Sequence, residues 1–132
     1  LEHKIQINFD DIKRTPNTLN AHRLIHWAGL EQKQNSAVDL LFSEYFVNGN
    51  DISNENILTN VANKIEMNKD NIAQSINSDE DLKNINDRIQ NAGKKGVNGV
   101  PCFIIDNQYV LQGAQSTEFW IQVIDETSNK NA

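Results

Sequence analysis

His22 and His26 are the first residues whose spacing could support chemistry, because imidazoles four residues apart on a helix can share one metal ion. The zinc-protease helix also needs a Glu directly after its first His, but position 23 is Arg. No third ligand is evident, and His3 lies close to the start of the chain. Packing or capping hydrogen bonds explain the pair better, so the sequence predicts no metal site.

Cys102 is the single cysteine of the chain, and it heads a short apolar run. A reactive thiolate needs a nearby positive charge or a helix N-terminus, and the neighbouring sequence shows neither. We therefore interpret Cys102 as a small buried hydrophobe and predict no catalytic residue in this chain. The acidic run Asp79-Glu80-Asp81 could hold a cation, but a place in the first turn of a predicted helix explains it without one.

The stretch from Gly96 to Asp106 has the strongest functional pattern, with two glycines leading into a Val100–Pro101 bond and an apolar run. A proline donates no hydrogen bond, so it must open a strand or lie at an edge. We interpret the stretch as a tight loop that delivers backbone to a site. A cis Val100–Pro101 bond is our hypothesis, since cis bonds are nearly confined to X-Pro pairs in tight turns.

Helical periodicity dominates the part of the chain that must position this loop. Apolar residues recur at helical spacing, and Gly29 and Gly49 are predicted to end the first two helices. The predicted helices are one capped by Asn17 or Thr18 and running to Ala28, one from Glu31 to Asn48, one capped by Ser53, one opened by Asp70, one capped by Ser78 and closed by Gly93 and Gly96, and one capped by Ser116.

Two segments have the alternating period of strands instead. Residues 5–9 predict a short strand or an extended arm. Residues 102–105 and 108–111 predict a hairpin around Asp106-Asn107, a turn that could extend to Gln108. A hairpin with apolar residues on both faces belongs inside a larger sheet, so the other strands must come from missing sequence, a second chain or the arm.

Composition limits the function classes. The chain has 132 residues, enough for one domain, and a net charge of −6, which argues against a nucleic-acid binder. No apolar run approaches the roughly 20 residues of a membrane helix, and one cysteine gives no reason to expect an oxidising compartment. Because the chain opens on Leu1 without a secretory pattern, we expect part of a longer, cytoplasmic product.

Three segments together resemble one protein family. Arg14–Ala28, read as PNT…AHRLIHWA, resembles the opening of the helical region in FrnE-like members of the DsbA family. Leu41–Ile52 is similar to that group's LF..YF..G.DI stretch. Gly96–Phe103 resembles its GVxGVPxF loop, and Gly113–Gln115 follows as its GAQ does. The resemblance covers nearly the whole chain.

The resemblance implies an α/β, thioredoxin-like fold with an inserted helical domain, present here as a mostly α fragment. Residues 1–16 would be an arm that ends the first thioredoxin half, 17–95 the inserted helices, and 96–132 the second half with its hairpin and helix. It also implies that Val100 and Pro101 bind substrate, and that Asn17, Thr18 and Gln115 face the same cleft.

The departure from the family is the missing Cys-x-x-Cys, which would lie in the first half at a helix start. The resemblance therefore implies the C-terminal portion of a thiol–disulfide oxidoreductase or isomerase that is inactive alone. Alternatives are a glutathione-dependent isomerase of the 2-hydroxychromene-2-carboxylate type and a non-catalytic helical interaction module. Expected partners are a thiol or disulfide peptide or small molecule, with glutathione as a candidate co-substrate, no cofactor, and a homodimer through the open sheet edge.

Overall fold

The computed structural model of the chain describes residues 5–130, and of Lys130 only the backbone. It contains two compact units, Leu1–Asn86 and Asp87–Ala132, which we call the first and second units and treat separately. Their boundary lies within helix α5 (Leu82–Lys94). The division at residues 16 and 95 that the sequence suggests stays a prediction.

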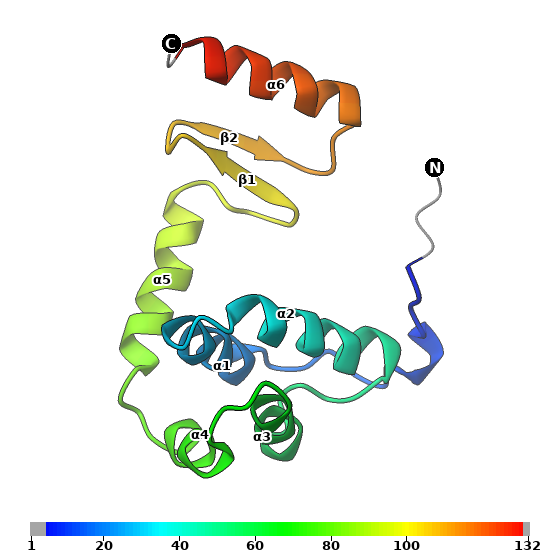
Figure 1. Cartoon of the computed structure of the whole chain (residues 1–132), viewed down its shortest axis with the longest axis vertical. Helices are drawn as coiled ribbons and strands as arrows, with labels where there is room; N and C mark the ends of the chain where they lie inside the picture. The colour runs from blue at the N-terminus through cyan, green and yellow to red at the C-terminus, as the bar shows by residue number, and fades with distance from the viewer. Residues whose placement is uncertain (1–4, 131–132) are drawn as a thin grey trace. The chain divides into compact units, whose positions relative to one another are not determined.

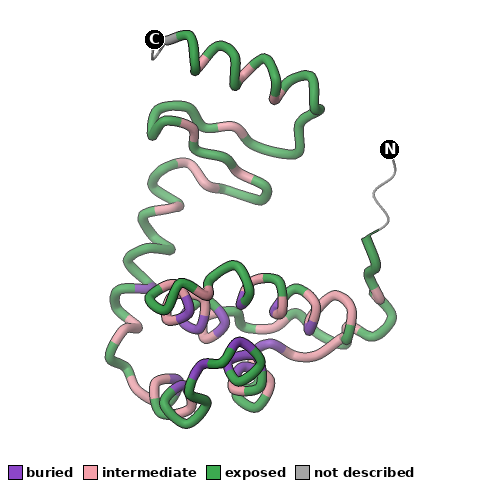
Figure 2. Tube along the Cα trace, viewed as in Figure 1, coloured by how far each residue is buried: buried purple, intermediate pink, exposed green. Residues whose placement is uncertain are grey.

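The first unit is a set of short helices around a single apolar core (Figures 1 and 2). Each helix is amphipathic, and its inward stripe meets the stripes of its neighbours. The elements are η1 (Phe9–Asp11, 3-10), α1 (Leu19–Leu30), α2 (Gln34–Phe42), η2 (Ser43–Val47, π-helical), α3 (Glu55–Lys64), α4 (Lys69–Ile76) and the start of α5.

The core follows the predicted stripes of α1 and α3. Leu24, Leu58 and Val61 are fully buried, and small residues such as Ala28 let the helices approach closely. In the next helix the apolar spacing predicts an inward stripe with Leu41 and Phe42, but Ala37 and Leu41 are buried whereas Phe42 is exposed. The π-helical turn η2 directly follows α2 and so continues the single helix that was predicted to Asn48.

Two helix ends in this unit are closed without glycine. Gly29 lies inside α1, so its predicted role as the stop is wrong. Gln32, at φ 60°, adopts the left-handed conformation, and the Lys33 backbone N–H donates to the Ala28 carbonyl at 2.7 Å in a Schellman arrangement. Glu66, also at φ 60°, closes α3 in the same way.

The N-caps of α3 and α4 are asparagines. Asn54 accepts from the Asn56 N–H, and Asn68 accepts from the N–H groups of Asp70 and Asn71. The predicted cap at Ser53 and the predicted start at Asp70 are therefore each misplaced. An amide oxygen caps as well as a hydroxyl does, and the asparagines lie one or two residues from the predicted positions.

The N-terminal arm forms no strand over its described residues from Ile5 onward. Asn8 instead donates through its backbone N–H to the Phe46 carbonyl at 2.8 Å and through its side chain to the Val47 carbonyl at 2.6 Å. The arm is thus held on η2. Residues 5–8 are not in a strand, so this described part of the arm supplies none of the strands that the hairpin lacks.

The second unit is a hairpin of β1 (Cys102–Ile105) and β2 (Tyr109–Gln112), with α6 (Thr117–Lys130) beside it (Figure 1). Ile105 pairs with Tyr109, so the turn extends to Gln108 and the second strand begins one residue later than the predicted 108–111. Asp106 and Asn107 both have positive φ, as a type I′ turn requires. Ser116 caps α6 as predicted, accepting from the Phe119 N–H at 3.2 Å.

This unit buries little of its apolar surface. The Phe103 ring meets Trp120 edge-on at 4.6 Å between centroids, yet none of the described side chains from 87 to 129 is buried (Figure 2). Phe103, Ile104, Tyr109 and Val110 stay exposed on the hairpin. The two strands form a two-stranded sheet with apolar residues left uncovered, which is marginal by itself.

Candidate functional site

The loop from Gly96 to Pro101 begins at a fixed point. Gly96, at φ 87°, ends α5 in a Schellman arrangement, with its N–H donating to Gly93 and the Val97 N–H donating to Ala92. The side chain of Gln112 donates to the Gly96 carbonyl at 2.5 Å. The end of α5 and the strand β2 therefore both fix Gly96 in place.

The loop also ends at a fixed point. The Val100–Pro101 peptide bond is cis, the isomer that the sequence suggested. The Pro101 carbonyl accepts from the Gly113 N–H at 2.8 Å, directly beyond the last strand pair. Pro101 and the Gly113-Ala114-Gln115 segment are thus brought together, a contact that sequence reasoning did not identify.

Between these anchors, Val100 is the most open apolar residue of the loop, with 92% of its surface exposed. Its backbone N–H and C=O have no hydrogen-bond partner in the part of the chain that the structure describes. A loop fixed at both ends thus presents a free backbone donor and a free backbone acceptor at Val100, beside the Gly99 N–H, which is equally unpaired among the described residues. This is the arrangement that an extended peptide needs for main-chain pairing.

The remaining predicted site residues lie in different places. Gln115 is exposed and donates to the Gln112 carbonyl at 3.1 Å, close to the loop's second anchor. Asn17 and Thr18 belong to the first unit, where Thr18 is the N-cap position of α1 and Asn17 accepts from the Leu19 N–H. A shared cleft for these residues stays a prediction.

Cys102 is half-buried at the start of β1, where it pairs across the ladder with Gln112. His22 is exposed on α1, while His3 lies outside the described residues. Among residues 5–130, no three His, Cys, Asp or Glu side chains group closely enough to hold a metal ion.

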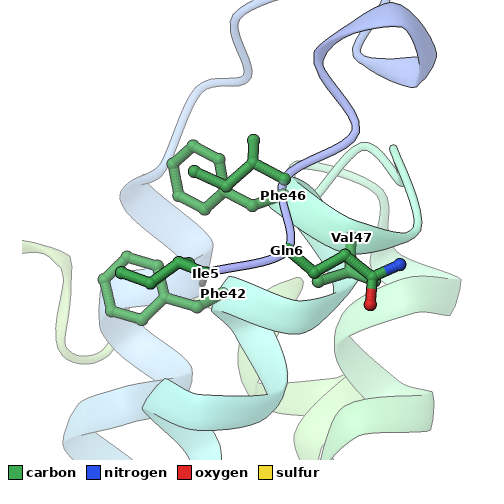
Figure 3. Close-up of a pocket in the computed structure, with 6 residues that line it drawn as sticks. Ile5, Gln6, Phe42, Phe46 and Val47 are labelled. Carbon is green, nitrogen blue, oxygen red and sulfur yellow. The ribbon is translucent and has the colours of Figure 1, made fainter. Parts of the chain in front are cut away.

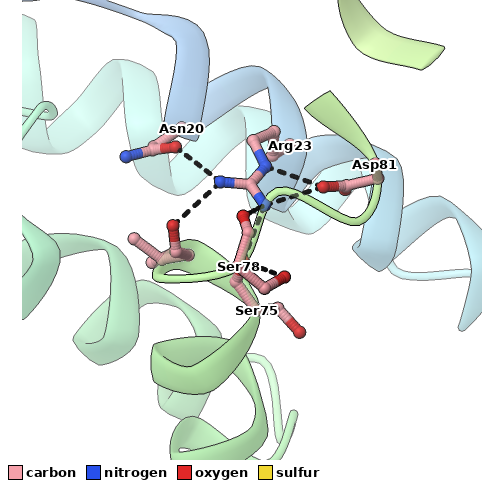
Figure 4. A network of polar contacts seen from close by, with 6 residues as sticks. Asn20, Arg23, Ser75, Ser78 and Asp81 are labelled. Carbon is pink, nitrogen blue, oxygen red and sulfur yellow. Dashed lines mark hydrogen bonds and ion pairs between the residues drawn. The ribbon is translucent and has the colours of Figure 1, made fainter. Parts of the chain in front are cut away.

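Sequence reasoning missed a buried arginine in the first unit (Figure 4). Arg23 on α1 is 1% exposed, and its guanidinium donates to the carbonyls of Ser75, Ile76 and Ser78 at 2.6–2.9 Å. It also pairs with Asp81 at 2.7 Å, donates to Asn20 and lies over the Trp27 ring. These carbonyls are at the C-terminal end of α4, where a cation is favoured.

This network corrects the interpretation of the acidic run. α5 begins at Leu82, so Asp79-Glu80-Asp81 precedes the helix and the predicted cap at Ser78 is wrong. The Ser78 hydroxyl donates to the Ser75 carbonyl, and Asp81 serves as the counterion of Arg23. A usable signal existed, because Asn20, Arg23 and Trp27 share one helix face beside the apolar stripe.

Glu44 on η2 is a second buried charge that sequence reasoning missed. Its carboxylate accepts from Lys64 at 2.7 Å, and from the amides of Asn50 and Asn48. The hydrogen bond from Lys64 is the largest cause that lowers the pKa of Glu44, to about 2, against the opposing effect of burial. Asn60 and Asn63 extend this group into a polar recess of about 390 Å³.

An apolar groove lies where the arm meets η2 (Figure 3). Its volume is about 280 Å³, and no titratable side chain lines it, so it offers binding surface without chemistry. The lining residues are Ile5, Gln6, Ile7, Phe42, Phe46 and Val47.

Comparison with known protein families identifies the family of the chain. Residues 2–125 match the DSBA-like thioredoxin domain, and the chain therefore belongs to that family. No curated protein matches it. None of the described helices is long and apolar enough to cross a membrane.

Among solved structures, the chain is similar to a probable DsbA oxidoreductase from Streptomyces coelicolor, with a TM-score of 0.78 and 20% sequence identity. The match covers 86% of this chain and 49% of the relative, so the chain spans about half of that protein's length. The predicted fold class is confirmed: a thioredoxin-like DsbA fold, mostly helical here, with a small antiparallel sheet.

Proposed function

We propose that this chain supplies the substrate-binding wall of a thiol–disulfide oxidoreductase of the FrnE-like subgroup. Val100 and Pro101 are the residues that carry this role. An extended thiol or disulfide peptide, or glutathione, pairs with the Val100 backbone and holds its sulfur beside a redox dithiol. A thiolate of that dithiol then attacks the disulfide through a mixed-disulfide intermediate.

The observation that carries the proposal is that the backbone N–H and C=O of Val100 are unpaired among the described residues. These two groups are without partners there although the loop is tied at Gly96 and at Pro101. Free main-chain groups on an otherwise anchored loop lose little conformational entropy when a ligand binds.

The dithiol itself is proposed to lie outside this chain. The chain has one cysteine, and it spans about half the length of its structural relative. The uncovered apolar residues of the hairpin support the same view, since further strands would cover them. Asn17, Thr18 and Gln115 are proposed to face the completed cleft.

Insulin reduction tests this division of labour. With added dithiol, the 132-residue chain should reduce insulin disulfides no faster than the dithiol alone. A longer product that includes the upstream coding sequence should be active. Turnover by the 132-residue chain, or an inactive longer product that is folded, would contradict the proposal.

A second candidate is a homodimer formed through the open hairpin edge. The hairpin favours it, because each strand of this two-stranded sheet has a neighbour on one side only, within the described part of the chain, and can accept another strand at its edge. The exposed Phe103, Ile104, Tyr109 and Val110 would gain cover in such a dimer. Sedimentation velocity over a range of concentrations should then show a dimer. A monomer at all concentrations would contradict this candidate.

A further inference from the structure

The sequence contains two Asn-Gly pairs, Asn48-Gly49 and Asn98-Gly99, in opposite structural settings. Glycine after asparagine removes the Cβ that would hinder attack by the following backbone nitrogen on the side-chain amide. The two pairs therefore share one intrinsic chemistry. Their surroundings decide whether the reacting atoms can meet.

The Asn48-Gly49 pair is fixed in place by hydrogen bonds and close packing. The Asn48 side chain donates to Glu44 at 3.1 Å, and its backbone N–H donates to the Ser43 carbonyl at 3.0 Å. Gly49, at φ 68°, is packed so closely that a Cβ would lie 2.6 Å from the Asp11 carbonyl oxygen. The amide carbon of Asn48 thus has little freedom to approach the Gly49 nitrogen.

The Asn98-Gly99 pair is free. Both residues are exposed, outside any helix or strand. Neither the Asn98 amide nor the Gly99 N–H has a hydrogen-bond partner within residues 5–130. A Cβ on Gly99 would meet nothing within 4 Å. The near-attack arrangement of nitrogen and amide carbon is therefore accessible at this pair.

We propose that Asn98 is a site of spontaneous deamidation. The Gly99 nitrogen loses its proton and attacks the Asn98 Cγ, which expels ammonia and closes a succinimide ring. Water then opens the ring to aspartate or isoaspartate, so the net change is one water consumed and one ammonia released. The product carries a new negative charge two residues before Val100, and the isoaspartate form lengthens the loop by one backbone carbon.

Tandem mass spectrometry of the intact 132-residue chain, aged at mildly alkaline pH and then digested, tests the site directly. Conversion of amide to acid should appear at Asn98 at least about tenfold faster than at Asn48, a barrier difference of about 1.4 kcal/mol. In denaturant the two rates should converge, because the sequence pair is the same. Equal rates in the folded chain, or a faster Asn48, would overturn the proposal.

Gly99→Ala is a clean second variant, because the position has neither a positive φ nor a neighbour for the added Cβ. It should keep the fold and slow conversion at Asn98 at least about tenfold. Asn98→Gln should abolish conversion at that position. Unchanged conversion in Gly99→Ala would show that backbone attack by this nitrogen is not the route.

The effect on binding rests on the proposed function. Asn98→Asp should weaken binding of anionic glutathione relative to Asn98→Gln, since it places a like charge beside the loop. Equal binding by the two variants would refute this effect on binding. It would not bear on deamidation at Asn98, which mass spectrometry tests independently.

Discussion

Glu44 offers a test of how much one buried ion pair stabilises the first unit. The pKa of its carboxyl is lowered from 4.5 to about 2, chiefly by the hydrogen bond from Lys64. At about 1.4 kcal/mol per pH unit, this corresponds to about 3 kcal/mol as an upper limit. Because the Lys64 side chain is 54% exposed and screened by solvent, we expect about 1–2 kcal/mol.

The direction with pH follows from the lowered pKa. The stabilisation is fully present above about pH 4.5, where the carboxyl is ionised in both folded and unfolded chains. It is lost as the pH falls toward 2, where the folded state takes up its proton. Glu44→Gln should therefore lower the free energy of unfolding by about 1–2 kcal/mol at neutral pH, and by progressively less in acid.

Urea denaturation followed by far-UV circular dichroism measures the difference between native chain and variant at each pH. Other carboxyl groups titrate in both proteins, so their effects cancel in that difference. Glu80→Gln, at an exposed position, is the matched control for the removal of one carboxylate. The reasoning would be refuted if the difference in free energy of unfolding between the native chain and Glu44→Gln stayed constant from neutral pH to pH 2.

Two further substitutions test the first unit. Arg23→Met leaves Asp81 without its buried counterion and should cost about 3–5 kcal/mol in the urea unfolding free energy; a loss below about 1 kcal/mol would contradict the network's importance. Gly49→Ala forces a Cβ against Asp11 at φ 68° and should cost at least about 1–3 kcal/mol, whereas Gly99→Ala should be near neutral; equal effects would show that the close packing at Gly49 is not limiting.

Local patterns predicted the helices of the first unit well, because the stripes of α1 and α3 record which faces are buried. Caps were less predictable. Gln32 and Glu66 adopt the left-handed backbone that sequence reasoning assigns to glycine, and Schellman hydrogen bonds compensate the cost.

The partners of the two buried charges could not be predicted from local sequence. Arg23 meets Asp81 across 58 residues, and Glu44 meets Lys64 across 20, so each pair forms only when helices pack. The glycines and Pro101 predicted a loop ahead of the first strand, and the structure has one there with a cis Val100–Pro101 bond. The hydrogen bond from the Gly113 N–H to the Pro101 carbonyl depends on the register of the hairpin. The sequence allowed two registers that differ by one residue.

The most direct test of the central claim is an amide-resolved NMR titration of the 132-residue chain with an extended peptide whose cysteine sulfur is methylated. Shifts should centre on Val100 and its neighbours. Val100→Ala keeps the N–H and should keep binding, whereas Val100→Pro removes the N–H and should lose it. Shifts centred elsewhere, or equal binding by the two variants, would contradict the claim that the Val100 backbone binds substrate.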